Sequence, residues 1–232
     1  MLGFSYLTPR EIAERHAMVQ AFLDEEGASP IITSGRGKNI VTEWVKDKNA
    51  KILDCAPGTG LFLEQLTKEG YTHLYGADID NYLHDDVKAE FKAVDVCMQP
   101  LPWPDHFFDV VTSFETVEHL ENPYHFVREM HRVLKPGGVF ILSMPNVQHI
   151  FNRIFFFRKG DMPRWRKNNN HLGIFPKGVF HKLFLRSFDA VHTGYFWGFF
   201  PWRFLSKLSF WPANEKFAHT VYYVFKPKEL TN

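Results

Sequence analysis

The sequence predicts an α/β fold: a doubly wound, seven-stranded, mostly parallel sheet with helices on both faces. The first observation is a series of short apolar runs that lack polar alternation, which is typical of strands buried on both faces. The second is that helical stretches separate most of these runs, as crossovers between parallel strands require. The predicted strands cover residues 50–55, 72–78, 91–95, 107–114, 137–145, 190–196 and 219–225.

The predicted helices begin near the N-terminus. Residues 9–24 form an amphipathic pattern that opens with Thr8 as N-cap and Pro9 in the first turn. Residues 27–37 are rich in turn formers and predict a link. Residues 146–173 break the alternation and are predicted to be irregular, and a long loop of this kind inside a compact domain is usually functional. Further helices are predicted over residues 39–47, 61–69, 86–91, 122–134 and 176–188.

Composition indicates a single domain over residues 1–232, with residues 1–48 as an N-terminal helical cap. Hydrophobic residues make up 45% and charged residues 23%, which is typical of a globular protein. We find no apolar run long enough to span a membrane, and charged residues come too early for a secretory signal. The expected location is therefore cytoplasmic. Cys55 and Cys97 are predicted to be reduced packing residues.

Residues 51–66 join an apolar strand to an amphipathic helix through a turn that contains Gly58 and Gly60. Such a turn lets a ligand approach the backbone, and the helix N-terminus supplies unpaired N–H groups. A phosphate-binding P-loop would need a lysine directly after Gly60, and a dinucleotide fingerprint would need glycine in place of Leu63. Asp54 lies before the turn, where a carboxylate repels pyrophosphate and attracts an amine. The predicted ligand is zwitterionic or cationic.

This turn resembles the first motif of the class I S-adenosylmethionine-dependent methyltransferases, types 11 and 23, in which an acidic residue precedes a Gly-x-Gly-x-Gly run. Here Asp54 is followed by Ala56, Gly58 and Gly60, so that alanine replaces the first glycine. The resemblance covers residues 50–146 and continues through LYGADID, AVDVCMQPLPWPDHFFDVV and HRVLKPGGVFILSMPN. It implies the Rossmann-like sheet of that family with its last strand antiparallel, and S-adenosylmethionine as cofactor.

The resemblance also implies which residues contact the cofactor. Asp78 ends the second predicted strand, where its carboxylate can accept both ribose hydroxyls. Asp95 matches the position that binds adenine in the family. The cofactor-binding residues expected on this basis are Asp54, Ala56, Gly58, Gly60, Asp78, Ile79, Asp95, Val96, Phe114 and Glu115.

A second group of polar residues follows the fourth predicted strand in SFETVEHLENP, at the edge where ligands of open α/β folds bind. On a turn of helix, Glu115, Glu118 and His119 are spaced to share one face. Two carboxylates and an imidazole can hold a divalent cation, or can position an acid and a base.

With His171 further along the chain, this pattern resembles two groups of metal-dependent enzymes: the ubiquinone-pathway O-methyltransferases and the small-RNA terminal 2′-O-methyltransferases. In both, a magnesium-type ion brings a hydroxyl oxygen to the methyl sulfonium. The resemblance implies Glu115, Glu118, His119 and His171 as metal ligands. The Glu-His pair also occurs in metal-free relatives, and in that interpretation His119 or His171 is the general base, because imidazole titrates near neutral pH.

The region from Phe151 to Pro212 is both basic and aromatic. It holds eleven Lys and Arg against two Asp, and it contains 13 of the 24 Phe and four of the six Trp, in a chain of net charge +1. Four interpretations fit: an aromatic core under a basic surface, a pocket for a planar, lipophilic or anionic acceptor, contact with anionic lipid, and nucleic-acid binding. Nucleic acid is the weakest, because the basic excess does not extend over the whole chain.

The predicted function is transfer of the methyl group of S-adenosylmethionine to a small molecule, with residues 147–175 inserted as an acceptor lid. The expected acceptor atom is a hydroxyl oxygen, ahead of an amine or a carbon. Two alternatives stay open. One is an RNA 2′-O-methyltransferase, and the other is a non-catalytic module that binds S-adenosylmethionine.

Overall fold

The computed structural model describes most of the chain from residue 29 onward. The helix predicted over residues 9–24 lies almost wholly outside the described residues, and so does most of the predicted N-terminal cap that precedes residue 29. The residues described are 29–165, 170–197 and 213–229, with Arg10, Ala13, Glu14 and Ala17.

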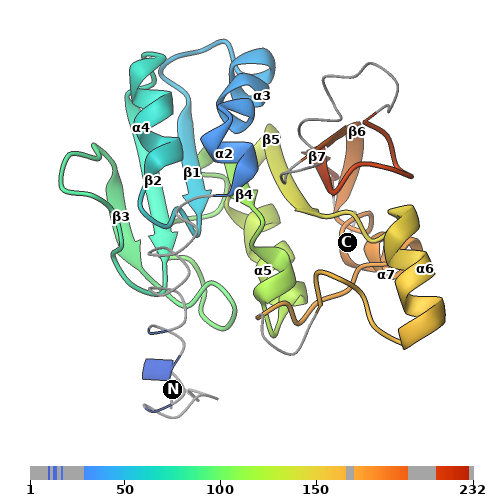
Figure 1. The fold of residues 1–232 in the computed structure, drawn as a ribbon. Helices are drawn as coiled ribbons and strands as arrows, with labels where there is room; N and C mark the ends of the chain where they lie inside the picture. Colours follow the sequence, from blue (N-terminus) through green and yellow to red (C-terminus); the bar gives the residue numbers. More distant parts are fainter. Residues whose placement is uncertain are drawn as a thin grey trace.

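A seven-stranded sheet in the order β3-β2-β1-β4-β5-β7-β6 forms the centre of the described structure (Figure 1). Strands β1 to β5 pair in parallel, whereas β7 runs antiparallel to both of its neighbours, β5 and β6. The predicted fold class is confirmed: the protein is α/β with a mostly parallel sheet and an antiparallel last strand. The strands are β1 Lys51–Cys55, β2 His73–Asp78, β3 Glu90–Ala93, β4 Phe108–Phe114, β5 Leu134–Pro145, β6 Phe188–Phe196 and β7 Thr220–Pro227.

Helices cover both faces of the sheet. Consecutive strand residues point to opposite faces, so Ile52 and Leu53 of β1 belong to two different core clusters. The cluster of Ile52 contains residues of α2, α3 and α4, and that of Leu53 contains residues of α5 and α7. Cys55 and Cys97 are buried thiols, as expected of packing residues. The helices within the described residues are α2 Pro30–Thr33, α3 Arg36–Trp44, α4 Leu61–Lys68, the 3-10 helix η1 Val117–His119, α5 Pro123–Val133, α6 Ile150–Lys159 and α7 Lys177–Leu183.

The helix predicted over residues 86–91 is wrong. Glu90 and Phe91 instead belong to β3, where they pair with Tyr75 and Gly76 of β2. The residues before β3 form no helix, and Val87 packs against the core cluster of α2 to α4. Pairing and burial therefore outweigh a weak helical pattern.

Two helices lie where the sequence predicted irregular structure. Helix α2 is part of the predicted link, and α6 occupies residues 150–159 of the predicted irregular segment. The side chain of His149 caps α6 by accepting a hydrogen bond from the backbone N–H of Phe151 at 3.2 Å. Gly160 ends the helix with a φ of +68°. Among the described residues, no helix has the length and apolar character needed to cross a membrane.

Candidate active site

The order of the strands reverses between β1 and β4, because β2 lies on one side of β1 and β4 on the other. In open α/β sheets, ligands bind outside the carboxyl ends of the strands at such a reversal. Strands β1 to β4 are parallel, so the loops that follow them reach the same edge. Most of the predicted cofactor and metal residues lie at the ends of these strands or on the loops that follow them, whereas His171 lies between α6 and α7.

In the turn between β1 and α4, every second residue has a left-handed backbone conformation. Ala56, Gly58 and Gly60 have φ values of +63°, +54° and +82°. For Ala56 this conformation costs about 1–2 kcal/mol, and a non-glycine residue held in a strained conformation is typical of a functional site. Gly60 has a second constraint, because a Cβ atom at this position would lie 2.8 Å from Leu83 and 2.9 Å from Val87.

Asp54 is buried near the end of β1, with its side chain 2% exposed. Its Oδ1 atom accepts a hydrogen bond from the hydroxyl of Thr112 on β4 at 2.7 Å. Burial raises the pKa of Asp54 to about 7, the Thr112 hydrogen bond lowers it, and the nearby carboxylate of Asp78 raises it further. Because its pKa is higher in the folded chain, Asp54 stabilises the fold only when it is protonated. This contribution to folding free energy is fully present below the ordinary aspartate pKa and is lost as the pH rises through about 7.

Asp78 and Asp95 continue the acidic edge. Burial raises the pKa of Asp78, at the end of β2, to about 6, although its carboxylate accepts hydrogen bonds from the backbone N–H groups of Ile79 and Gly58. Asp95 follows β3 and accepts a hydrogen bond from the N–H of Cys97 at 2.9 Å. A carboxylate has about four acceptor positions, so both groups can still bind a ligand.

A second acidic group lies just after β4. Glu118 is fully buried in η1. Apart from its own backbone N–H, neither carboxylate oxygen has a hydrogen-bond partner among the described residues. Burial raises the pKa of Glu118 well above its ordinary value, the Glu115 carboxylate adds to this, and Arg164 opposes it. A buried carboxylate without a partner is costly, so the site favours either a proton or a bound cation.

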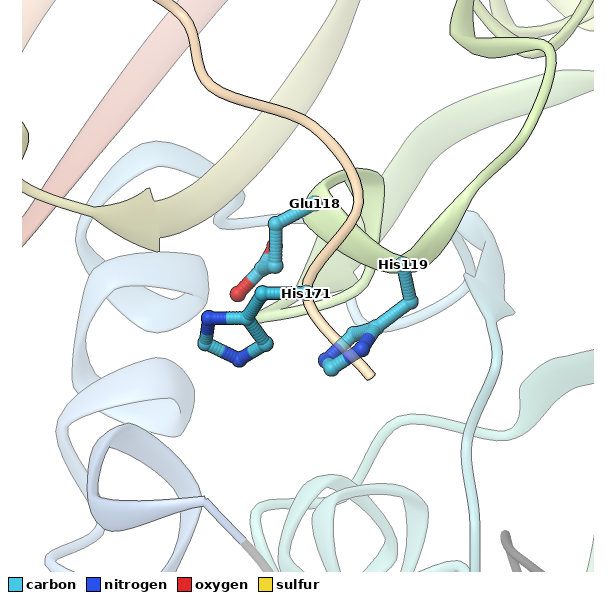
Figure 2. Close-up of side chains that lie close together, drawn as sticks. All are labelled: Glu118, His119 and His171. Atoms are coloured by element: carbon cyan, nitrogen blue, oxygen red, sulfur yellow. The ribbon is translucent and has the colours of Figure 1, made fainter. Parts of the chain in front are cut away.

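Two histidines converge on Glu118. One ligand atom from each of Glu118, His119 and His171 lies within 4.8 Å of the other two. Figure 2 shows the carboxylate and both imidazoles pointing into the same region, with His171 on a separate loop. That loop is held to η1, because the N–H groups of Leu172 and Gly173 donate to the carbonyl of Glu118 at 2.7 Å and 2.8 Å.

The hydrogen bond of His119 fixes its tautomer. Its Nδ1 atom lies 3.2 Å from the carbonyl of Asn170. A carbonyl can only accept, so Nδ1 carries the proton and Nε2 presents a lone pair. Burial lowers the pKa of His119 and lowers that of His171 to about 3, where the neighbouring His119 and Arg164 act in the same direction. Both rings are neutral at physiological pH, which is the form that binds metals.

Glu115 is not part of this cluster. It lies between β4 and η1 with a φ of +53°, so it does not share a helical face with Glu118 and His119 as the sequence predicted. Its Oε2 atom accepts a hydrogen bond from Arg164 at 2.7 Å. Sequence reasoning missed Arg164, because only folding of residues 147–175 brings this arginine to the end of β4.

The other predicted residues differ in accessibility. Ile79 is half-buried beside Asp78, and Val96 is buried after β3. Phe114 is a core residue whose ring packs edge-on against Phe62 with centroids 4.9 Å apart. Thr112, the hydrogen-bond donor to Asp54, was not predicted, because its role depends on the pairing of β1 with β4.

Comparison with known proteins finds similarity to methyltransferases. Residues 53–142 match the family model described as a methyltransferase domain. A probable S-adenosylmethionine-dependent methyltransferase of Mycolicibacterium smegmatis is 32% identical over 158 residues, which cover 60% of this chain and 58% of that protein. The ubiquinone biosynthesis O-methyltransferase of Pseudomonas aeruginosa is 26% identical over 149 residues, covering 59% of this chain and 62% of that protein. The match thus spans about three-fifths of the length of these relatives.

A solved structure supports the fold over a longer range. The S-adenosylmethionine-dependent methyltransferase of Archaeoglobus fulgidus superposes with a TM-score of 0.61 at 17% identity, covering 90% of this chain and 98% of that one. The order of the sheet and the glycine turn agree with the match of residues 53–142 to the methyltransferase domain model.

The steric constraint on Gly60 leads to a first prediction. Gly60→Ala should destabilise the protein more than Gly70→Ala, although both glycines have positive φ values, +82° and +89°. Nothing lies within 4 Å of a Cβ atom at Gly70, so that variant carries only the backbone cost of about 1–2 kcal/mol. Gly60→Ala adds an overpacking cost of about 1–3 kcal/mol. Urea unfolding measures both, and equal losses would contradict the packing described for this turn.

Proposed function

We propose that this protein transfers the methyl group of S-adenosylmethionine to a hydroxyl group of a small-molecule acceptor. The observation that carries the proposal is the acidic edge formed by Asp54, Asp78 and Asp95 beside a left-handed glycine turn. Two of these carboxyl groups have raised pKa values, so a cationic ligand is favoured there over an anionic one. The sulfonium and ammonium groups of S-adenosylmethionine meet this requirement, and the residues present fit this cofactor.

Each part of the cofactor has a candidate partner. The carboxylate of Asp78 would accept hydrogen bonds from the ribose hydroxyls, and Asp95 with Val96 would bind the adenine. The turn from Ala56 to Gly60, next to Asp54, would hold the amino-acid part, with Ile79, Phe114 and Glu115 lining the site. When bound, the cofactor supplies an activated methyl group, so the protein mainly has to align the acceptor and exclude water.

We also propose that Glu118, His119 and His171 hold a divalent cation, with Glu115 outside the ligand set because it pairs with Arg164. Support comes from the unpartnered Glu118 carboxylate and from the Nε2 lone pair of His119. Two imidazoles and one carboxylate are more typical of Mn²⁺, Fe²⁺, Co²⁺ or Zn²⁺ than of Mg²⁺. A bound cation would lower the pKa of an acceptor hydroxyl, which favours O-methylation. Without a cation, His119 or His171 would act as the general base.

A cavity near this cluster is the candidate acceptor site. Its volume is about 370 Å³, within the range of small-molecule pockets. Arg164 lines it and also pairs with Glu115, so the cavity is linked to the end of β4. Phenyl rings with a few polar groups suit a planar or lipophilic acceptor that carries a polar substituent. The lining residues are His149, Phe151, Asn152, Phe155, Pro163, Arg164 and His219, most of them within the proposed lid of residues 147–175.

The cofactor site leads to a second prediction. Asp78→Asn should weaken binding of S-adenosylhomocysteine by roughly 10- to 100-fold, because it removes a charged acceptor of hydrogen bonds worth about 1.5–3 kcal/mol. Isothermal titration calorimetry measures the change, and Asp86→Asn, an exposed aspartate eight residues further along the chain, is the matched control. If the unmodified protein gave no binding heat, or if Asp78→Asn bound S-adenosylhomocysteine as tightly as the unmodified protein, the proposal would be wrong.

The metal site leads to a third prediction. After chelation, Mn²⁺ at about 100 times its dissociation constant should stabilise the protein by about 2.7 kcal/mol, or roughly 5–10 °C in Tm. In Glu118→Gln this shift should be lost, whereas the control Glu121→Gln should keep it. A thermal shift assay needs no acceptor, so it tests the ion independently of activity. Equal Mn²⁺ shifts in Glu118→Gln and the unmodified protein would contradict the assigned ligands.

A further inference from the structure

Helix α6 has an inner face and an outer face of unusual composition. Phe151, Asn152 and Phe155 line the cavity on the inner side. On the outer side Ile154 is 40% exposed and Phe157 is 91% exposed. Figure 1 shows α6 at the periphery of the described structure, beside α7. Neighbouring apolar side chains exposed on one helix face are a candidate surface for contact with a partner or a membrane.

Positive charge surrounds this exposed pair. Arg153 and Phe157, and likewise Ile154 and Arg158, are four residues apart, so all four side chains share one side of the helix. Lys159 adds a third cation in the last turn, and the ten residues of α6 contain no acidic side chain. Phe156, at the margin of this face, is 55% exposed. We call Arg153, Ile154, Phe157 and Arg158 the outer face of α6.

We propose that the outer face of α6 docks on an anionic phospholipid surface, a role that goes beyond the proposed function and does not depend on it. Helices that lie in a membrane interface combine apolar side chains, which enter the boundary of the acyl chains, with basic side chains that attract anionic headgroups. The outer face of α6 provides both within two helical turns. With ten residues, α6 can lie on a bilayer but cannot cross one.

Charge argues against a second copy of this chain as the occupant. In a two-fold symmetric dimer the same patch meets itself, which would bring the arginines of one copy close to those of the other. RNA would match the arginines, but it would leave Ile154 without an apolar partner. An anionic bilayer satisfies both parts of the face.

Docking on α6 would also bring the cavity close to the membrane. The two faces of α6 are separated by about one helix diameter, roughly 10 Å. An acceptor that partitions into the bilayer would therefore have a short path to the cavity. This last point rests on the proposed function, whereas the docking itself does not.

Vesicle sedimentation with the full chain tests the docking. The protein should sediment with phosphatidylcholine vesicles that contain phosphatidylglycerol and should stay in solution with phosphatidylcholine alone. Raising the salt concentration should release it, because salt screens the attraction between the arginines and the headgroups. Absence of sedimentation with the anionic vesicles, or equal sedimentation with the neutral ones, would overturn the proposal.

Substitutions on the outer face separate the apolar contribution to vesicle binding from the electrostatic one. Phe157→Ser should lower vesicle affinity roughly tenfold, because a buried aromatic ring is lost, and Arg158→Gln should lower it about fivefold. The matched controls are Tyr124→Ser and Arg128→Gln, at exposed positions on α5, and both should bind vesicles like the unmodified protein. Controls that lose affinity as much as the α6 variants would overturn the assignment to α6.

Two further measurements identify any other occupant. Binding of S-adenosylhomocysteine should be the same in Phe157→Ser and the unmodified protein, so loss of vesicle binding alone concerns only the docking face. A dimer in sedimentation velocity that Phe157→Ser dissociates would overturn the membrane proposal in favour of a second copy. RNA binding that Arg158→Gln abolishes, without any binding to vesicles, would overturn it in favour of nucleic acid.

Discussion

Carboxyl groups held out of water at one edge of the sheet are the constraint on which the rest of the site depends. Asp54 and Glu118 are buried in the folded chain and Asp78 is half-buried, and burial raises the pKa of all three. Such groups cost folding free energy unless a proton or a cation compensates them. The fold keeps them because parallel strands place the ends of β1 and β2 and the segment that follows β4 at a common edge. The chain thus forms an edge that favours cationic ligands before any ligand binds.

The segment that ends β4 lies between the acidic edge of Asp54, Asp78 and Asp95 and the cluster around Glu118. Glu115 is strained at a φ of +53° and is held by Ser143 of β5, whose hydroxyl accepts the Glu115 N–H at 3.1 Å. Arg164 then pairs with Glu115 and also lines the cavity beside α6. One residue at the end of β4 therefore connects the proposed cofactor edge, the Glu118 cluster and the proposed acceptor cavity. This arrangement accounts for the strain at Glu115 as part of the site.

The sequence predicted those parts of the structure that depend on local pattern. Apolar runs identified all seven strands, and the glycine turn and the position of Asp78 followed from short motifs. The sequence failed where distant packing decides. Residues 86–91 have a weak helical pattern, but Glu90 and Phe91 pair with β2 and so begin strand β3. Consecutive aromatic residues hid the helical period of α6, although Gly160 was a readable C-terminal signal. The Arg164 pair with Glu115 spans 49 residues, and no local pattern predicts such a contact.

Proton release on cofactor binding is the most direct test that a cation binds at the acidic edge. Calorimetric titration of the protein with S-adenosylmethionine should be performed at a pH between the pKa values of Asp78 and Asp54, about 6 and about 7, in two buffers of different ionisation enthalpy. A cation bound at the acidic edge lowers both pKa values, so we predict net release of protons and a smaller release in Asp54→Asn. Binding heats that are identical in the two buffers, or proton uptake, would contradict it.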